Sequence, residues 1–178
     1  NLEINVNLLN NSNLFWLPKE LILFNNCNLK RKINFNLSKD SNLLLCENII
    51  FGRTSMKEEF KKGYFSDFWN INVDNKLIHT EAINTGLFEK KYLNSFSTLN
   101  NNSAVATIII VGNKFLNNVN NLSETLTNNE NTTSNYSHWD NKLIVRLLSK
   151  DSYNLKFAID KILSYFFEGS KIPKVWNI

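Results

Sequence analysis

The sequence predicts a mainly β fold of stacked, antiparallel-rich sheets with one C-terminal helix, and it leaves open a second short helix. Three observations lead to this fold class. Apolar and polar residues alternate through the first half of the chain, short β-branched runs lie between asparagine and glycine, and helical periodicity is clear near the C-terminus alone. With 178 residues, 43% of them hydrophobic, the chain can bury one core, so we expect residues 1–178 to form a single domain.

The first half reads as a series of half-buried strands. Every second residue is apolar from Leu2 to Leu8, and one face of a later segment carries Leu29, Arg31, Ile33, Phe35 and Leu37. A turn is expected at 38–41, followed by a more buried strand at 43–51. We treat these as separate strands and expect no internal repeat.

The middle of the chain mixes strands with less regular segments. Asp74-Asn75 predicts a β-hairpin, and the β-branched run at 104–111 predicts a central strand. The segment 54–62 fits either a short helix ended by Gly63 or a continuing strand. The polar, aperiodic stretch at 117–137 predicts a flexible loop.

The C-terminal part contains a strand at 142–148 and then a helix at about 152–168. Asp151 is placed to cap the helix, and Gly169 to end it. One apolar stripe is formed by Leu155, Ile159, Ile162 and Phe166. Further aromatic residues widen this surface beyond what one contact needs, namely Tyr153, Phe157, Tyr165 and Phe167.

Composition excludes several classes of protein. The net charge is +4, and in its one basic run Lys30 and Lys32 share a strand face while Arg31 points the other way. The run reads as a solvated strand face, so we expect no nucleic-acid partner. No apolar run reaches about 18 residues, and no membrane partner is expected. Cys27 and Cys46 make no disulfide framework, which favours the cytoplasm.

Motifs for chemistry are missing. His79 and His138 are far apart, and no Cys-x-x-Cys, nucleophile elbow or phosphate loop occurs, so we expect neither an enzyme nor a tightly bound metal. In Phe51-Gly52-Arg53, glycine permits a turn after a strand. Arg53 is expected to be buried and to pair with Glu47 or Glu58.

Several phrases together resemble the urease accessory protein D family. They are Trp16-Leu17-Pro18-x-Glu20, Phe24, Leu29, Glu47 before Phe51-Gly52-Arg53, Glu58, Asp67, Trp69, Glu81, Leu143 to Leu148, Asp151, Leu155 and Pro173-Lys174-Val175-Trp176. The chain departs from the family where Lys57 replaces a glycine and Lys174 an arginine. It resembles the C-terminal two-thirds of the family's fold, without the N-terminal portion.

The resemblance implies a urease maturation factor. Such a scaffold binds apo-urease and recruits accessory protein F and the GTPase accessory protein G, so that nickel reaches the enzyme. It implies nickel only in transit, along carboxylates for which Glu47, Glu58, Asp67 and Glu81 are candidates by position. Docking or framework roles are expected for Glu20, Gly52, Arg53, Tyr165, Phe167 and Trp176, with the helix and the Trp176 tail supporting contact with accessory protein F.

Two other functions remain open from the residues alone. A β-rich carbohydrate-binding or interaction module would use Trp16, Trp69 and Trp139 as stacking platforms. A glycoside hydrolase would use a pair of carboxylates such as Glu58 and Asp67. Tryptophan in strands is more often core, and exposed carboxylates are usually solvated, so both functions rank below the scaffold.

Overall fold

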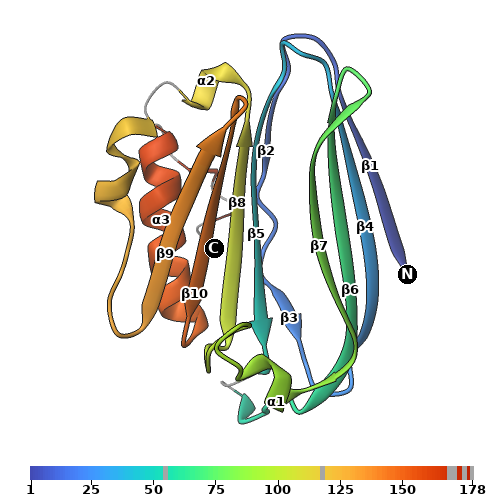
Figure 1. The fold of residues 1–178 in the computed structure, drawn as a ribbon, viewed down its shortest axis with the longest axis vertical. Coiled ribbons are helices and arrows are strands. Elements are labelled where there is room, and N and C mark those ends of the chain that lie inside the picture. Colours follow the sequence, from blue (N-terminus) through green and yellow to red (C-terminus); the bar gives the residue numbers. More distant parts are fainter. Residues whose placement is uncertain (54–55, 117–118, 168–171, 174–175, 177–178) are drawn as a thin grey trace.

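The computed structural model describes residues 1–53, 56–116, 119–167, 172–173 and 176. These residues form two stacked β-sheets and a helical layer (Figure 1). Sheet A has the strand order β1 (Leu2–Leu8), β4 (Asn28–Leu37), β6 (Lys62–Val73) and β7 (Lys76–Glu89). Sheet B has the order β2 (Asn13–Trp16), β5 (Asn42–Phe51), β8 (Ala104–Val111), β10 (Lys142–Ser149) and β9 (Thr132–Trp139), with β3 (Leu21–Leu23) also on β5.

The prediction of a mainly β fold with stacked sheets is therefore confirmed, and the strand pairing is mixed. Strands β1, β4 and β6 are parallel, as are β2 and β3 with β5. The remaining neighbours are antiparallel, including the expected hairpin of β6 and β7. Asp74 and Asn75 form its turn with φ of 47° and 62°, the left-handed conformation that two-residue hairpins require.

The parallel strands belong to successive coils of a β-solenoid, in which each coil contributes strands to both sheets. Residues 29 positions apart pair in both sheets, with Ile4 opposite Ile33 in sheet A and Asn13 opposite Asn42 in sheet B. The chain thus passes from one sheet to the other and back. Its sequence carries the repeat, since Ile-Asn-x-Asn-Leu-x-x-x-Ser-Asn-Leu occurs at 4–14 and at 33–43. The expectation of no internal repeat was wrong.

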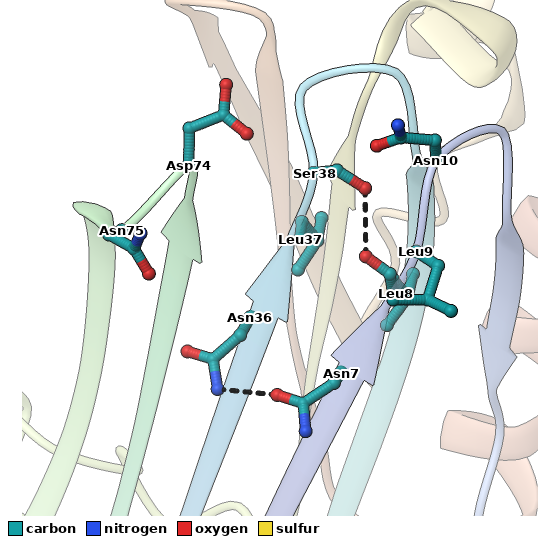
Figure 2. A pocket seen from close by; sticks show the side chains of 9 residues that line it. All are labelled: Asn7, Leu8, Leu9, Asn10, Asn36, Leu37, Ser38, Asp74 and Asn75. Atoms are coloured by element: carbon teal, nitrogen blue, oxygen red, sulfur yellow. Dashed lines mark hydrogen bonds between the residues drawn. The ribbon is translucent and has the colours of Figure 1, made fainter.

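Asparagine side chains form ladders on the outer face of sheet A. Asn70 Nδ2 donates to Asn34 Oδ1 at 3.2 Å, and Asn34 Nδ2 donates to Asn5 Oδ1 at 2.7 Å. The ladder beside it joins Asn72, Asn36 and Asn7, and Figure 2 shows its Asn36–Asn7 bond. In-register parallel strands place identical amides at bonding distance. Part of the asparagine enrichment therefore stabilises this sheet.

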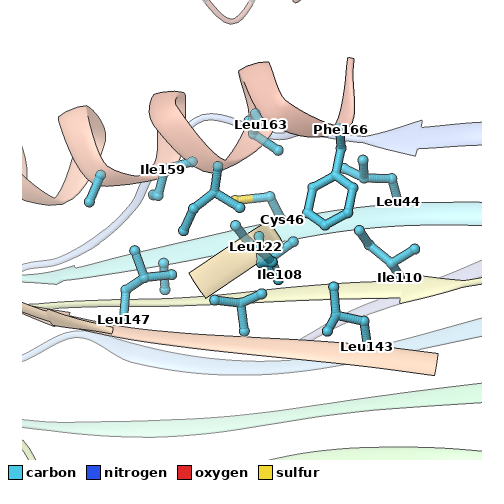
Figure 3. Packing of buried hydrophobic residues seen from close by; sticks show 14 of the residues in the cluster. Leu44, Cys46, Ile108, Ile110, Leu122, Leu143, Leu147, Ile159, Leu163 and Phe166 are labelled. Carbon is cyan, nitrogen blue, oxygen red and sulfur yellow. The ribbon is translucent and has the colours of Figure 1, made fainter. Parts of the chain in front are cut away.

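The helix α3 (Ser152–Phe166) covers the face of sheet B that points away from sheet A (Figure 1). Its buried residues pack on alternate residues of β5, β8 and β10, as Figure 3 shows for Ile159, Leu163 and Phe166. Asp151 caps it by accepting a hydrogen bond from the Asn154 backbone N–H at 2.8 Å. The predicted helix and cap are confirmed, and the predicted stop at Gly169 lies outside the described residues.

The polar stretch at 117–137 is not an irregular loop over its described part. Val119–Thr125 forms the 3₁₀ helix η2, whose Val119 and Leu122 are buried in the core beneath α3. Thr132 begins β9, which pairs with β10 along its whole length. Backbone pairing stabilises a strand even where its side chains are polar, which is why the polar composition was misleading.

The alternatives for 54–62 are also corrected. Residues 54–55 lie outside the described part, and Gly63 belongs to strand β6, so it ends no helix. A Cβ there would lie 2.9 Å from Cys27 Sγ, which explains the glycine. The short helices described are α1 (Lys90–Leu93) and α2 (Asn113–Leu116).

Candidate functional site

A layer of charged side chains crosses the space between the two sheets. Arg31 of β4 and Asp67 of β6 point inward from sheet A, and Glu47 of β5 points inward from sheet B. All three are buried, with exposed fractions of 8%, 1% and 2%. The layer separates two apolar clusters of the inter-sheet core, one around Phe35 and the other around Phe65.

Arg31 holds both carboxylates. Its Nε and Nη2 donate to the two oxygens of Asp67 at 2.8 and 2.6 Å, and Nη2 also donates to Glu47 Oε2 at 2.9 Å. The other oxygen of Glu47 accepts from Trp16 Nε1 at 2.8 Å. Trp16 and Glu47, from two of the sequence phrases, thus meet around Arg31, which points away from Lys30 and Lys32 as the alternation predicts.

The pKa shifts follow from this arrangement. Burial alone would lower the pKa of Arg31, but the hydrogen bonds and charges of Asp67 and Glu47 raise it above its ordinary value. Burial raises the pKa of Glu47, and the neighbouring Arg31 and Trp16 oppose that rise only in part. The folded state therefore binds a proton on Glu47 more tightly than the unfolded chain does. The stability of the fold falls as pH rises from the ordinary glutamate pKa through the raised pKa of Glu47.

A second ionic group lies in the same layer, toward β7 and β10. Arg146 donates to both oxygens of Glu81 at 2.8 and 2.7 Å and to Thr107 Oγ1 at 3.0 Å. His79 Nε2 lies 3.4 Å from Glu81 Oε2. Burial would raise the pKa of Glu81, but His79 and Arg146 lower it below its ordinary value. Glu81 thus stabilises the fold at neutral pH, and that contribution is lost as pH falls through its lowered pKa.

Glu58 lies apart from these carboxylates, at the turn after β5. Its carboxylate accepts from Arg53 Nε and from the Asn25 backbone N–H. The predicted Arg53–Glu58 pair is therefore present, but the Arg53 side chain is 45% exposed and not buried, and Glu47 is not its partner. Gly52 has φ of +95°, and a Cβ on it would approach the Glu58 carbonyl to 3.0 Å, so this turn requires glycine.

The same turn explains the departure at Lys57. Lys57 has φ of 55°, in the left-handed region that favours glycine, and the family that the sequence resembles has a glycine there. Replacing Lys57 with glycine should stabilise the protein by about 0.5–1 kcal/mol, because relief of strain exceeds the entropy that glycine adds to the unfolded chain. Thermal unfolding measures this. Lys39→Gly, at an exposed residue without positive φ, should give no gain, and a lower midpoint for Lys57→Gly would contradict the account.

The phrase Trp16-Leu17-Pro18-Lys19-Glu20 forms an interruption at the edge of sheet B. Trp16 pairs with Leu45 and Leu21 with Ile49, so four residues lie opposite three of β5. Proline, which lacks a backbone N–H, suits such a bulge. Glu20 is exposed there, and Lys19 Nζ donates to the Trp176 carbonyl at 3.1 Å.

The C-terminal aromatic residues divide into buried and exposed sets. Trp176 is 1% exposed, and its Nε1 donates to Asp160 Oδ1 at 2.6 Å, so it anchors the chain to α3 and offers no surface. Tyr165 and Phe167 are half-buried, and Phe167 packs on Phe15 with ring centroids 4.8 Å apart. The exposed aromatic residues of α3 are Tyr153 and Phe157, at 80% and 64%.

The hollow in Figure 2 carries Asp74 as its one titratable side chain. The hollow in Figure 2, of about 570 Å³, lies among turns at one end of sheet A and is lined mainly by asparagine and leucine. Of the three tryptophans considered for carbohydrate, Trp69 is 1% exposed, Trp16 is half-buried, and Trp139 is 43% exposed. Asp67 and Glu58 are each held by a different arginine, so they do not form the pair that the hydrolase alternative needs.

No metal-binding group of three or more histidine, cysteine or acidic residues occurs among the described residues. Within the same residues, no helix is long and apolar enough to cross a membrane. Cys27 and Cys46 are both buried and unpaired with each other.

Comparison with known proteins gives a consistent result. The family model described as UreD urease accessory protein matches residues 1–177. A urease accessory protein UreD of Rhizobium leguminosarum bv. viciae is 32% identical over 166 residues, which is 92% of this chain and 59% of that protein. The Granulibacter bethesdensis protein of that name is 41% identical over 97 residues, or 54% of this chain and 40% of its own length. The chain thus spans about three-fifths of the length of the first of these curated relatives.

Proposed function

This chain belongs to the UreD urease accessory protein family, and from that membership we propose that it acts in the maturation of urease as a scaffold and not as an enzyme. The observation that carries the proposal is the match to the family over residues 1–177. In the proposed role the protein binds apo-urease and recruits accessory protein F and the GTPase accessory protein G. Its free, buried cysteines fit a reducing cytoplasm.

Helix α3 is the proposed contact for accessory protein F. Tyr153 and Phe157 are four residues apart, so they share one face of the helix, and both are largely exposed. Aromatic side chains on a rigid helix are typical anchors in a partner's groove. The half-buried Tyr165 and Phe167 support this surface from the C-terminal end of α3, where Tyr165 and Phe166 also pack edge to face.

Changing both Tyr153 and Phe157 to serine should weaken capture of purified accessory protein F by about tenfold or more, because two aromatic anchors are lost. Both side chains are exposed, so thermal unfolding should change little. Leu9→Ser is the matched control, since Leu9 is 77% exposed and directly follows β1 of sheet A, whereas α3 covers the face of sheet B that points away from sheet A. Equal capture by the double variant, the control and the parent chain would remove α3 from the proposed interface.

We propose further that nickel, as cargo, passes through the charged layer. Glu47, Asp67 and Glu81 lie in this layer, whereas Glu58 does not. Each carboxylate of the layer already binds an arginine, so a metal ion would compete with a resident cation and would be held weakly. Weak binding suits transit, since a tightly held ion would not leave.

Glu81→Gln tests the passage with little disturbance of the Arg31 group. Capture of apo-urease should be unchanged, while nickel content and urease activity after activation should fall several-fold. Glu58→Gln, which alters a candidate carboxylate outside the layer, should leave nickel loading at the parent level. Equal losses in both variants, or in neither, would argue against a path through the layer.

A further inference from the structure

Sheet A ends one strand before sheet B on the β7 side. Contacts between the sheets place β7 opposite β10, because Glu81 binds Arg146 and the Ile78 carbonyl accepts from Lys142 Nζ. Sheet B continues beyond β10 to β9, whereas β7 is the edge of sheet A. Among the described residues, no strand of sheet A therefore lies opposite β9.

The inner face of β9 is uncovered as a result. Thr132 and Ser134 are buried toward α3, while the alternate residues Asn135, Ser137 and Trp139 are exposed. With Ile144 and Arg146 of β10, these three line a hollow of about 280 Å³. The lining of this hollow is polar apart from the rings of Trp139 and Tyr136 and the largely buried Ile144.

Lys142 is a buried cation beside this hollow. It is 7% exposed, its Nζ donates to the Ile78 carbonyl, and the ammonium lies 4.7 Å from the centroid of the Trp139 ring. No carboxylate of the described residues forms an ion pair with it. A buried ammonium without a counter-ion is costly, so this position favours an incoming negative charge. Arg146, whose side chain is 51% exposed, also lines the hollow, but its charge is already paired with Glu81.

We propose that the edge of β7 accepts an extended segment of a protein partner, which adds to sheet A as a fifth strand opposite β9. Strand β7 is 14 residues long and has a neighbour in sheet A on one side only, which is the usual basis for strand addition, although its Ile78 carbonyl already accepts from Lys142 Nζ. The inward side chains of the added strand cover Trp139, and an acidic one among them pairs with Lys142. The partner segment therefore alternates acidic or small polar residues with apolar ones.

This surface is separate from α3, because β9 and β10 present opposite faces to the helix and to the hollow. It does not depend on the role proposed for α3 in urease maturation. Loss of binding at one surface should leave binding at the other intact.

The probe is a blocked octapeptide that alternates glutamate and valine, compared with the same peptide carrying lysine in place of glutamate. Hydrogen–deuterium exchange of the intact chain should slow at β7 and β9 with the glutamate peptide and stay unchanged with the lysine peptide. Lys142→Met should weaken the glutamate peptide by about tenfold or more, since a charge-assisted contact is lost. Lys32→Met removes an exposed lysine from the outer face of sheet A and should have no effect.

Trp139→Thr provides a second variant with a mostly exposed side chain, in case Lys142→Met fails to fold, and it should also weaken binding. Protection at β1 or α3 in place of β7 would overturn the proposal. Equal binding of the two peptides would do so as well, and so would undiminished binding to a folded Lys142→Met or Trp139→Thr variant.

Discussion

Replacing Arg31 with methionine should destabilise the fold by about 3–5 kcal/mol at pH 7, a large fraction of the stability of a typical domain. Methionine keeps much of the side-chain volume but removes the guanidinium that binds Glu47 and Asp67. Both carboxylates are at most 2% exposed, so they cannot regain water without opening the sheets. Urea unfolding of the parent and variant chains measures the difference.

The cost should depend on pH in a defined direction. Burial already raises the pKa of Glu47, and removal of Arg31 takes away the main charge that opposes this rise. The folded variant then binds protons more tightly than its unfolded chain, so its stability rises as pH falls. The difference between variant and parent should therefore shrink as the pH is lowered from 7 toward the ordinary glutamate pKa of 4.5.

Lys32→Met is the matched control for Arg31. Lys32 is the next residue of β4 and faces solvent, where its ammonium lies 3.5 Å from Glu3 Oε1. Such an exposed pair contributes about 0.2–1 kcal/mol, so this variant should differ little from the parent. Combining Arg31→Met with Glu47→Gln and Asp67→Asn should recover part of the loss, because no buried charge remains. If Lys32→Met and Arg31→Met lowered the free energy of unfolding by similar amounts, the charged layer would not be buried as described.

Arg31 also shows how far the sequence alone could lead. The alternation of β4 correctly placed Arg31 on the same face as Leu29, Ile33 and Phe35, and that face is the core. The basic run as a whole was interpreted as a solvated strand face, which holds for Lys30 and Lys32 and not for Arg31. A charged residue at an apolar position of an alternating strand predicts a buried ion pair, and Glu47 and Asp67 interrupt the apolar face of their strands in the same way. Which of these charged residues pair with one another depends on how the two sheets stack, and the periodicity of a single strand does not predict that stacking.

The strands themselves were largely predictable, and their order was not. The runs at 43–51 and 104–111 became β5 and β8, because β-branched and apolar residues suit strands buried on both faces. Parallel pairing of β1 with β4 could have been predicted from the repeat at 4–14 and 33–43. Strand β9 had no apolar signal, since its stability comes from its ladder with β10.

Replacing Trp176 with alanine should destabilise the protein by about 3–5 kcal/mol, the usual cost of truncating a large buried aromatic side chain. Trp176 is 1% exposed and belongs to the core beneath α3. Its loss also leaves Asp160 without the indole donor and removes the ring that the Lys156 ammonium faces at 4.9 Å. Trp176→Phe should cost less, because the ring remains and only the hydrogen bond is lost. Trp139→Ala, at a 43% exposed ring, should cost least.

This series separates an anchor from a docking tail. As an anchor, Trp176 affects binding of accessory protein F only through the stability of α3, so the conservative Trp176→Phe should bind nearly as well as the parent chain. As a docking tail, Trp176→Ala would lose binding while its urea midpoint stayed at the parent value. Because the Trp176 backbone carbonyl also accepts from Lys19, the anchor joins the C-terminal segment to the Trp-Leu-Pro-Lys-Glu bulge. The two sequence phrases at opposite ends of the chain then stabilise one structure, and the exposed aromatic face of α3 is left for the partner.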